Sequence, residues 1–336
     1  MKRSQLFCGM GSMAGMLILI LDGKTALLGA RDGLALCIQS LIPSLFPFFV
    51  LSSVLTTAFT GTSLPMLRPI GKLLGIPAGC EALLIPAYLG GYPAGARSIG
   101  EACKQIQLSP ENAQRLLLFC NNCGPSFLFG ILGSIFPKQW MLWILWGIQL
   151  AGSVFIARLF PAHPETGEMR SNPKSSVADS LTSSVSVMGA VCGWVILFRI
   201  LMTFLEKWVL WRFPVAIQVF FMGFLELSNG CCALAAVADL RLRFLLACGM
   251  LSFGGICVTM QTASAIGGLP IRGYLMAKGL QALFTFSIVA AFLYHMPVLL
   301  VAIVLCGCFL KKVVAKPRVI VYNDGINQRR NPYAVS

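Results

Sequence analysis

The chain has 336 residues, of which 57% are hydrophobic and only 11% charged, against about 25% charged in an ordinary soluble domain. These charges are too few to cover a soluble protein of this length, so lipid must contact much of its surface. The net charge of +14 does not indicate nucleic-acid binding, because the basic residues are spread over loops and a tail and form no stripe on a soluble domain.

Apolar runs separated by short charged clusters predict an all-α polytopic membrane protein. The chain starts with Met1-Lys2-Arg3 and an apolar run, like a signal peptide, but no small-x-small cleavage site precedes Asp22. We therefore expect an uncleaved first helix. In total we expect about eight transmembrane helices, with approximate limits 5–21, 34–60, 111–136, 138–160, 181–206, 244–268, 274–295 and 297–310.

Two further apolar segments, 79–102 and 214–239, have centres that would weaken a straight helix. The first centre is Leu89-Gly-Gly-Tyr-Pro-Ala-Gly95, and the second is Glu226-Leu-Ser-Asn-Gly-Cys231. Broken backbone at membrane depth is tolerated only where protein or a water-filled cavity covers it. We therefore predict two re-entrant helical hairpins, with tips at 90–95 and 227–230.

The chain contains the same order of segments twice: a span, a broken hairpin, a span that begins with an arginine, and a further span. Counted from a cytoplasmic N-terminus, the hairpins enter from opposite sides, which predicts the inverted repeats of many secondary transporters. The expected units are an N-terminal transmembrane helix and loop (1–33), a first repeat (34–160), a polar linker (161–180), a second repeat (181–295), a last transmembrane helix (296–310) and a basic cytoplasmic tail (311–336).

The basic tail favours an orientation with both termini in the cytoplasm. From Lys311 onward, six basic residues stand against the single acidic Asp324, in agreement with the positive-inside rule and with anionic lipid as the neighbour. The same orientation places four basic residues between positions 207 and 243 outside, which argues against it.

No pattern in the sequence predicts a cofactor, a metal site or an enzyme. Cys120-Asn-Asn-Cys123 has a zinc-like spacing, but a structural zinc site needs four ligands and no second pair accompanies it. The chain has no glycine-rich phosphate loop ending in Lys-Ser/Thr. His163 and His295 are its only histidines, and neither lies in a span centre near a credible nucleophile.

The sequence resembles the YlbJ family of sporulation integral membrane proteins in three ordered motifs: Ser44-Leu-Phe-Pro-Phe-Phe-Val-Leu-Ser52, Gly90-Gly-Tyr-Pro-Ala-Gly95 and Phe119-Cys-Asn-Asn-Cys-Gly-Pro125. The resemblance covers about residues 35–310 and implies two copies of the nucleoside-recognition (Gate) domain. It also implies a multi-pass protein in the cell membrane of an endospore-forming bacterium, made during sporulation and needed for the spore cortex.

A second resemblance concerns the later part of the chain. The stretch from Ser252 to Thr262, followed by Ile266-Gly-Gly268, is similar to a late helix of concentrative nucleoside transporters. In those transporters, hairpins and unwound helices from two inverted repeats enclose the nucleoside. The first hairpin tip departs from their pattern, because it lacks their glutamine and threonine and offers mostly backbone.

The candidate site of the first repeat combines polar side chains with helix breaks, at Gly91, Tyr92, Asn121, Asn122 and Gly124. Each asparagine amide offers two donors and an acceptor, and Gly124-Pro125 should interrupt the helix and free backbone groups for a ligand. The alternative is that the asparagines only join neighbouring helices, since interhelical polar contacts worth about 1 kcal/mol are common.

In the second repeat the candidates are Glu226, Asn229, Ser252, Gly254, Gln261 and Thr262. A carboxylate at membrane depth is costly enough to indicate a function by default, as a proton or cation site or a hydrogen-bond acceptor. The alternatives are that Glu226 lies at the membrane interface or pairs with Arg199. Asn229 belongs to the second hairpin tip, whereas the candidates from Ser252 to Thr262 belong to a stripe of small and polar side chains, which also permits close helix packing.

These observations predict a transporter-like protein that binds or moves a small polar solute at a midplane site formed by both repeats. The alternative is a non-transporting membrane scaffold that recruits other sporulation membrane proteins for cortex assembly. The expected partners are membrane lipid, the unknown solute and those membrane proteins, with a homo-oligomer left open and nucleic acid excluded.

Overall fold

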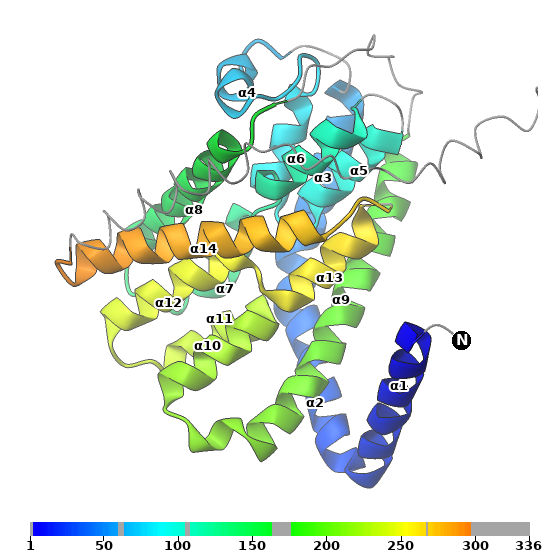
Figure 1. Cartoon of the computed structure of the whole chain (residues 1–336), viewed down its shortest axis with the longest axis vertical. Helices are drawn as coiled ribbons and strands as arrows, with labels where there is room; N and C mark the ends of the chain where they lie inside the picture. Colours follow the sequence, from blue (N-terminus) through cyan, green and yellow to red (C-terminus); the bar gives the residue numbers. More distant parts are fainter. Residues whose placement is uncertain (1–2, 60–63, 105–107, 163–175, 267, 297–336) are drawn as a thin grey trace, which may run out of the picture.

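The computed structural model describes residues 3–59, 64–104, 108–162, 176–266 and 268–296. All regular structure in these ranges is helical, which confirms the predicted all-α class. Helices α2 and α9 run side by side along the long axis of the molecule, whereas α8, α12 and α14 run across it (Figure 1).

The first part of the chain forms eleven helical segments: α1 (Arg3–Leu21), α2 (Gly23–Leu36), η1 (Cys37–Leu41), α3 (Ile42–Phe59), α4 (Arg68–Leu74), η2 (Glu81–Leu83), η3 (Pro86–Gly90), α5 (Ala94–Lys104), α6 (Pro110–Phe119), α7 (Pro125–Leu132) and α8 (Gln139–Leu159). The second part forms α9 (Val177–Trp208), η4 (Leu210–Arg212), α10 (Val215–Leu225), α11 (Leu227–Ala233), η5 (Leu234–Ala236), α12 (Leu240–Phe253), α13 (Gly255–Ala265) and α14 (Arg272–Leu293).

Five helical stretches of the described residues are long and apolar enough to cross a membrane: Gly23–Thr56, Gln139–Leu159, Val177–Trp208, Leu240–Ala265 and Gly273–Leu293. With these helices, the chain is an integral membrane protein. The expected loop before residue 34 is helical instead, because Asp22 caps α2 by accepting a hydrogen bond from the backbone N–H of Thr25.

The remaining predicted spans differ from these five helices. Span 111–136 is divided into the short helices α6 and α7 by the non-helical residues 120–124. Span 5–21 forms α1, in which 9–21 is the apolar part. Span 297–310 and the basic tail lie outside the described residues. Pro125 at the start of α7 explains the division, since proline fits the first turn of a helix but not its interior.

Helices α2 and α9 pack closely and antiparallel, from the contact of Asp22 with Lys207 at one end to that of Cys37 with Cys192 at the other. Gly29 and Gly33, four residues apart, permit this approach. A Cβ atom on Gly29 would lie 2.8 Å from the Cα of Ile200. Small residues with this spacing let membrane helices approach backbone to backbone.

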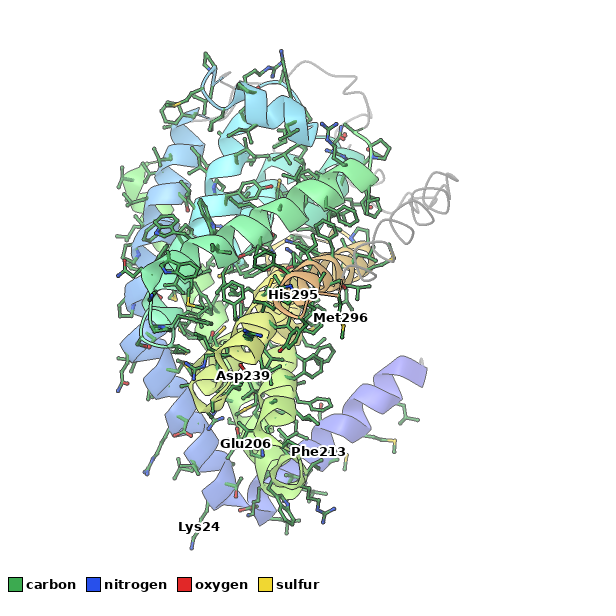
Figure 2. The ribbon with its side chains drawn as sticks, turned by 90° about the vertical axis from the view of Figure 1, so that its left-hand side faces the viewer. Lys24, Glu206, Phe213, Asp239, His295 and Met296 are labelled. Carbon is green, nitrogen blue, oxygen red and sulfur yellow. The ribbon has the colours of Figure 1, made fainter. Side chains whose placement is uncertain are left out.

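Ion pairs lie along the contact between α2 and α9. Arg199 binds Asp32 at 3.0 Å and Glu206 at 2.8 Å. The hydrogen bond from Lys207 holds the pKa of the Asp22 carboxyl below its usual value, with a further contribution from Thr25. Figure 2 shows Lys24, Glu206 and Phe213 at the same end of the molecule. The segments that follow α1 and α9 therefore share one end of the fold.

Candidate functional site

Both predicted hairpin segments are interrupted at their centres. In the first, η3 ends at Gly90 and α5 begins at Ala94. Gly91 between them has a φ of +79°, a conformation that only glycine adopts without strain. In the second, α10 and α11 pack against each other and are separated by Glu226 alone.

The first tip lies against the break between α6 and α7. A Cβ atom on Gly124 would lie 2.9 Å from the backbone nitrogen of Gly91, and one on Gly95 would lie 2.2 Å from the carbonyl oxygen of Cys120. Gly91, Gly95 and Gly124 therefore allow two non-helical stretches to meet backbone to backbone, which side chains at these positions would prevent.

The second tip repeats this contact. Gly254 and Gly255 have φ values of +84° and +85° and separate α12 from α13. A Cβ atom on Gly255 would lie 3.1 Å from the carbonyl oxygen of Gly223 and 3.3 Å from the backbone nitrogen of Leu227. In both halves, a hairpin tip thus lies against a glycine break in the helix that follows it.

Glu226 sits at the start of α11 with 1% of its surface exposed. Its carboxylate accepts hydrogen bonds from the backbone N–H groups of Ser228 at 3.0 Å and Asn229 at 2.7 Å. The side-chain amide of Asn229 donates a third, at 2.7 Å. The carboxylate is therefore the N-cap of α11, where the helix dipole also favours a negative charge.

Of the two alternatives considered for Glu226, the geometry excludes the ion pair with Arg199. The side chain is enclosed by protein, and its depth relative to the membrane interface stays a prediction. Arg199, the alternative ion-pair partner, binds Asp32 and Glu206 instead.

A cavity of about 20 Å³ joins the two tips. Its polar lining comes from both halves and includes the predicted residues Tyr92, Gly124, Glu226 and Gln261. The remaining lining residues are Leu41, Leu45, Cys123, Phe127, Val191, Val195, Leu227, Ser228 and Val258. A space of this size holds about one water molecule, so the site is closed around its centre.

Asn121 joins three elements beside the cavity. Its Oδ1 accepts a hydrogen bond from the backbone N–H of Ala96 at 3.3 Å, and its Nδ2 donates to Thr262 Oγ1 at 2.9 Å and Tyr274 Oη at 3.0 Å. These bonds link α5, α13 and α14 to the α6–α7 break. The interpretation of Asn121 as a residue that joins helices describes this geometry well, and the predicted Thr262 is its partner.

Asn122 is hydrogen-bonded to a charged residue, Lys278, that was not among the predicted site residues. Lys278 of α14 has no exposed surface, and its Nζ donates to Asn122 Oδ1 and to Gln281 Oε1, each at 2.9 Å. Gln281 Nε2 also donates to Asn122 Oδ1, at 3.2 Å. Within the described ranges, no carboxylate oxygen pairs with Lys278.

The rings of Tyr92 and Tyr274 complete the surroundings of Lys278. Their centroids lie 5.4 Å and 5.9 Å from Nζ, within the range in which an aromatic face attracts a cation. Tyr92 also lines the cavity. The same side chain therefore borders both the cavity and the Lys278 amino group.

The other predicted residues lie near this centre without lining the cavity. Ser252 is fully buried, and its hydroxyl lies 2.9 Å from that of Thr285. A Cβ atom on Gly254 would lie 3.1 Å from the Tyr92 hydroxyl, so this glycine makes room for the first tip. Gln149 of α8 was not predicted; its side-chain amide is buried and has no hydrogen-bond partner among the described residues.

A signal for Lys278 was present in the sequence. It is the only charged residue between Gly273 and His295, inside a predicted span. An ionisable residue within a membrane helix is a functional hypothesis by default, as it was for Glu226.

Comparison with known proteins gives one curated relative. The sporulation integral membrane protein YlbJ of Bacillus subtilis (strain 168) is 24% identical over 307 residues, which cover 76% of this chain and 74% of that protein. This similarity supports the expected YlbJ resemblance. No family model matches the chain, so the Gate-domain assignment stays a prediction. No solved structure matches it either.

Proposed function

We propose that the protein binds a small polar solute between its two hairpin tips and moves it across a membrane of the sporulating cell. The observation that carries this proposal is the cavity at which interrupted helices from both halves meet, lined by Tyr92, Gly124, Glu226 and Gln261. Transporters place their binding sites at such discontinuous helices, because freed backbone groups and helix ends can bind polar solutes there.

The proposal includes two inverted repeats, each with a re-entrant hairpin, within about eight transmembrane helices. It is supported by the matching contacts of Gly91 with Gly124 and of Leu227 with Gly255. The antiparallel pairing of α2 with α9 is a further support, because the continuous helical stretch Gly23–Thr56 leads into the first repeat and α9 leads into the second. Both termini then lie in the cytoplasm.

The size of the cavity indicates which conformation is described. About 20 Å³ admits a water molecule but not a nucleoside or another organic solute. A larger solute requires the tips to separate from each other. Separation of the tips would break backbone contacts at Gly91 and Gly255 and expose buried side chains such as Tyr92 and Leu227.

The role in sporulation is proposed from the similarity to the Bacillus subtilis protein, whose name describes a sporulation integral membrane protein. We propose that this chain is likewise made during sporulation, in the cell membrane of an endospore former, and that it is needed for the spore cortex.

A ligand screen on the purified protein tests the proposal. Thermal unfolding would be followed with nucleosides, dipicolinate and peptidoglycan precursors, for the wild type, Glu226→Gln and the control Glu111→Gln at an exposed site on α6. We expect one class to raise the unfolding temperature of the wild type and of Glu111→Gln, with at least a tenfold weaker midpoint for Glu226→Gln, about 1.4 kcal/mol.

The second candidate function is a non-transporting scaffold for cortex assembly. The small cavity and the hydrogen-bonded Glu226 favour it, because a rigid structural centre would look the same. Normal cortex formation in cells that carry only Glu226→Gln, together with no response to any solute class, would establish the scaffold and contradict transport.

A further inference from the structure

Lys278 is the most completely enclosed cation of the described fold. Its side chain has no exposed surface and lies in the second turn of α14, within a helix that can cross the membrane. A bare ammonium sealed away from water is costly unless a counter-charge or strong hydrogen bonds compensate it. Lys278 has amide oxygens and aromatic faces around it, but no carboxylate among the described residues.

The hydrogen bonds of Nζ suit both protonation states. Two acceptors, Asn122 Oδ1 and Gln281 Oε1, lie at 2.9 Å. A neutral amine has two N–H bonds and satisfies both acceptors, whereas an ammonium has a third N–H. The faces of Tyr92 and Tyr274 can attract that additional charge. A proton can therefore be gained or lost without breaking the network.

The neighbouring titratable groups do not supply a fixed negative charge. Cys120 and Cys123 lie nearby in the α6–α7 break, and Tyr92 and Tyr274 contribute their rings. The α12 side provides Cys248, close to Thr285. On α6, Arg115 binds the backbone oxygens of Leu74, Gly75, Ala157 and Phe160, and α8 presents Gln149 and Ser153, which do not titrate.

Access to this pocket depends on the first hairpin tip. Tyr92 belongs to that tip, lines the cavity and has its ring 5.4 Å from Lys278 Nζ, and its hydroxyl donates to the carbonyl of Leu251 at 3.3 Å. When the tip moves to admit a solute, as the proposed function requires, Lys278 becomes open to water from the cavity. Water contact stabilises the ammonium, and closure favours the neutral amine.

We propose that Lys278 is the proton-binding group that couples solute movement to a proton gradient. This inference rests on the proposed transport function. In the open conformation the Lys278 amine takes one proton from cavity water and becomes an ammonium. When the site next opens to the opposite side, where the proton concentration is lower, the ammonium returns that proton to a water molecule there, so each cycle moves one proton and leaves the amine unchanged.

The first test observes the proton directly. Full-length protein labelled with 13C at lysine Cε would be titrated in nanodiscs, and the Lys278 signal identified by its loss in Lys278→Met. A group that exchanges a proton in every cycle must titrate within about two units of the working pH. We expect the signal to move in that range; a signal that stays constant from about pH 5 to pH 9 would overturn the proposal.

The second test measures coupling in proteoliposomes that contain the pH-sensitive dye pyranine. With a solute identified by the ligand screen, we expect wild-type protein and the exposed control Lys72→Met to move protons together with solute. Lys278→Met, and Lys278→Gln if the methionine variant does not fold, should lose at least nine-tenths of the proton movement. Solute transport without proton movement in the wild type would overturn the coupling alone, whereas absence of solute transport would overturn the proposed function as well.

Discussion

Glu226 and Lys278 are both enclosed, but the fold compensates them differently. The Glu226 carboxylate receives three N–H groups at the start of α11, where the helix dipole adds a partial positive charge. The Lys278 amino group has only neutral oxygens and aromatic faces around it. Glu226 is therefore a cap that shapes its hairpin tip, whereas the surroundings of Lys278 support the proposed change of charge.

The capping role of Glu226 predicts that two substitutions differ in stability. Glu226→Ala removes the acceptor for the N–H groups of Ser228 and Asn229 and should destabilise the protein by about 1–2 kcal/mol. Glu226→Gln keeps one acceptor oxygen and should lose less than half of that. Thermal unfolding in detergent measures the difference. A Glu226→Ala variant as stable as the wild type would contradict a stabilising cap of α11.

The bond between Asn121 and Thr262 predicts a measurable coupling across the two halves. Asn121→Ala, Thr262→Val and the double variant form a cycle in which the pair should contribute about 0.6 kcal/mol, the average found for polar contacts between membrane helices, and at most about 1.7 kcal/mol. Unfolding of the three variants and the wild type supplies the four values. Strictly additive losses would contradict the hydrogen bond between these side chains.

At the scale of elements, the fold depends on backbone-to-backbone contacts made possible by glycine. The pair α2–α9 meets at Gly29 and Gly33, and each hairpin tip meets a glycine break. Apolar attraction between helices is weak in lipid, because lipid tails are as apolar as the side chains, so close packing carries more of the stability.

This packing predicts opposite effects for two Gly→Ala changes in the same helix pair. Gly29→Ala would place its Cβ 2.8 Å from the Cα of Ile200, so α2 and α9 must separate and the protein should lose about 1–3 kcal/mol. Gly193→Ala on α9 has no atom within 4 Å of its Cβ and should be neutral or gain up to about 1 kcal/mol of helix propensity. Thermal unfolding distinguishes them; equal effects would contradict the packing.

At the scale of the whole molecule, the sequence predicted the helix breaks better than the contacts between them. The breaks can be recognised from the sequence because certain residues oppose a straight helix. These are Gly91, Pro93, Gly124, Pro125 and the polar Glu226. Asn122 and Lys278 are 156 residues apart, and the cavity brings together positions from Leu41 to Gln261. No periodicity encodes such a contact, since it depends on how the two halves pack together.

The helix ends likewise depend partly on contacts between the two halves and partly on the local sequence. Helix α2 begins before the predicted span at 34–60. Its Asp32 pairs with Arg199 on α9, and hydropathy along the chain does not reveal this ion pair. The division of 111–136 follows from local chemistry at Gly124 and Pro125 and was predictable as an interruption.

The most direct test of the proposed central site is solute uptake by reconstituted protein. Proteoliposomes with wild-type protein, Glu226→Gln or Glu111→Gln would be supplied with each solute class of the ligand screen. We predict saturable uptake of one class by the wild type and by Glu111→Gln, reduced at least tenfold in Glu226→Gln, about 1.4 kcal/mol. Uptake that is unchanged in Glu226→Gln, or absent in the wild type for every class, would contradict a solute-transporting site between the hairpin tips.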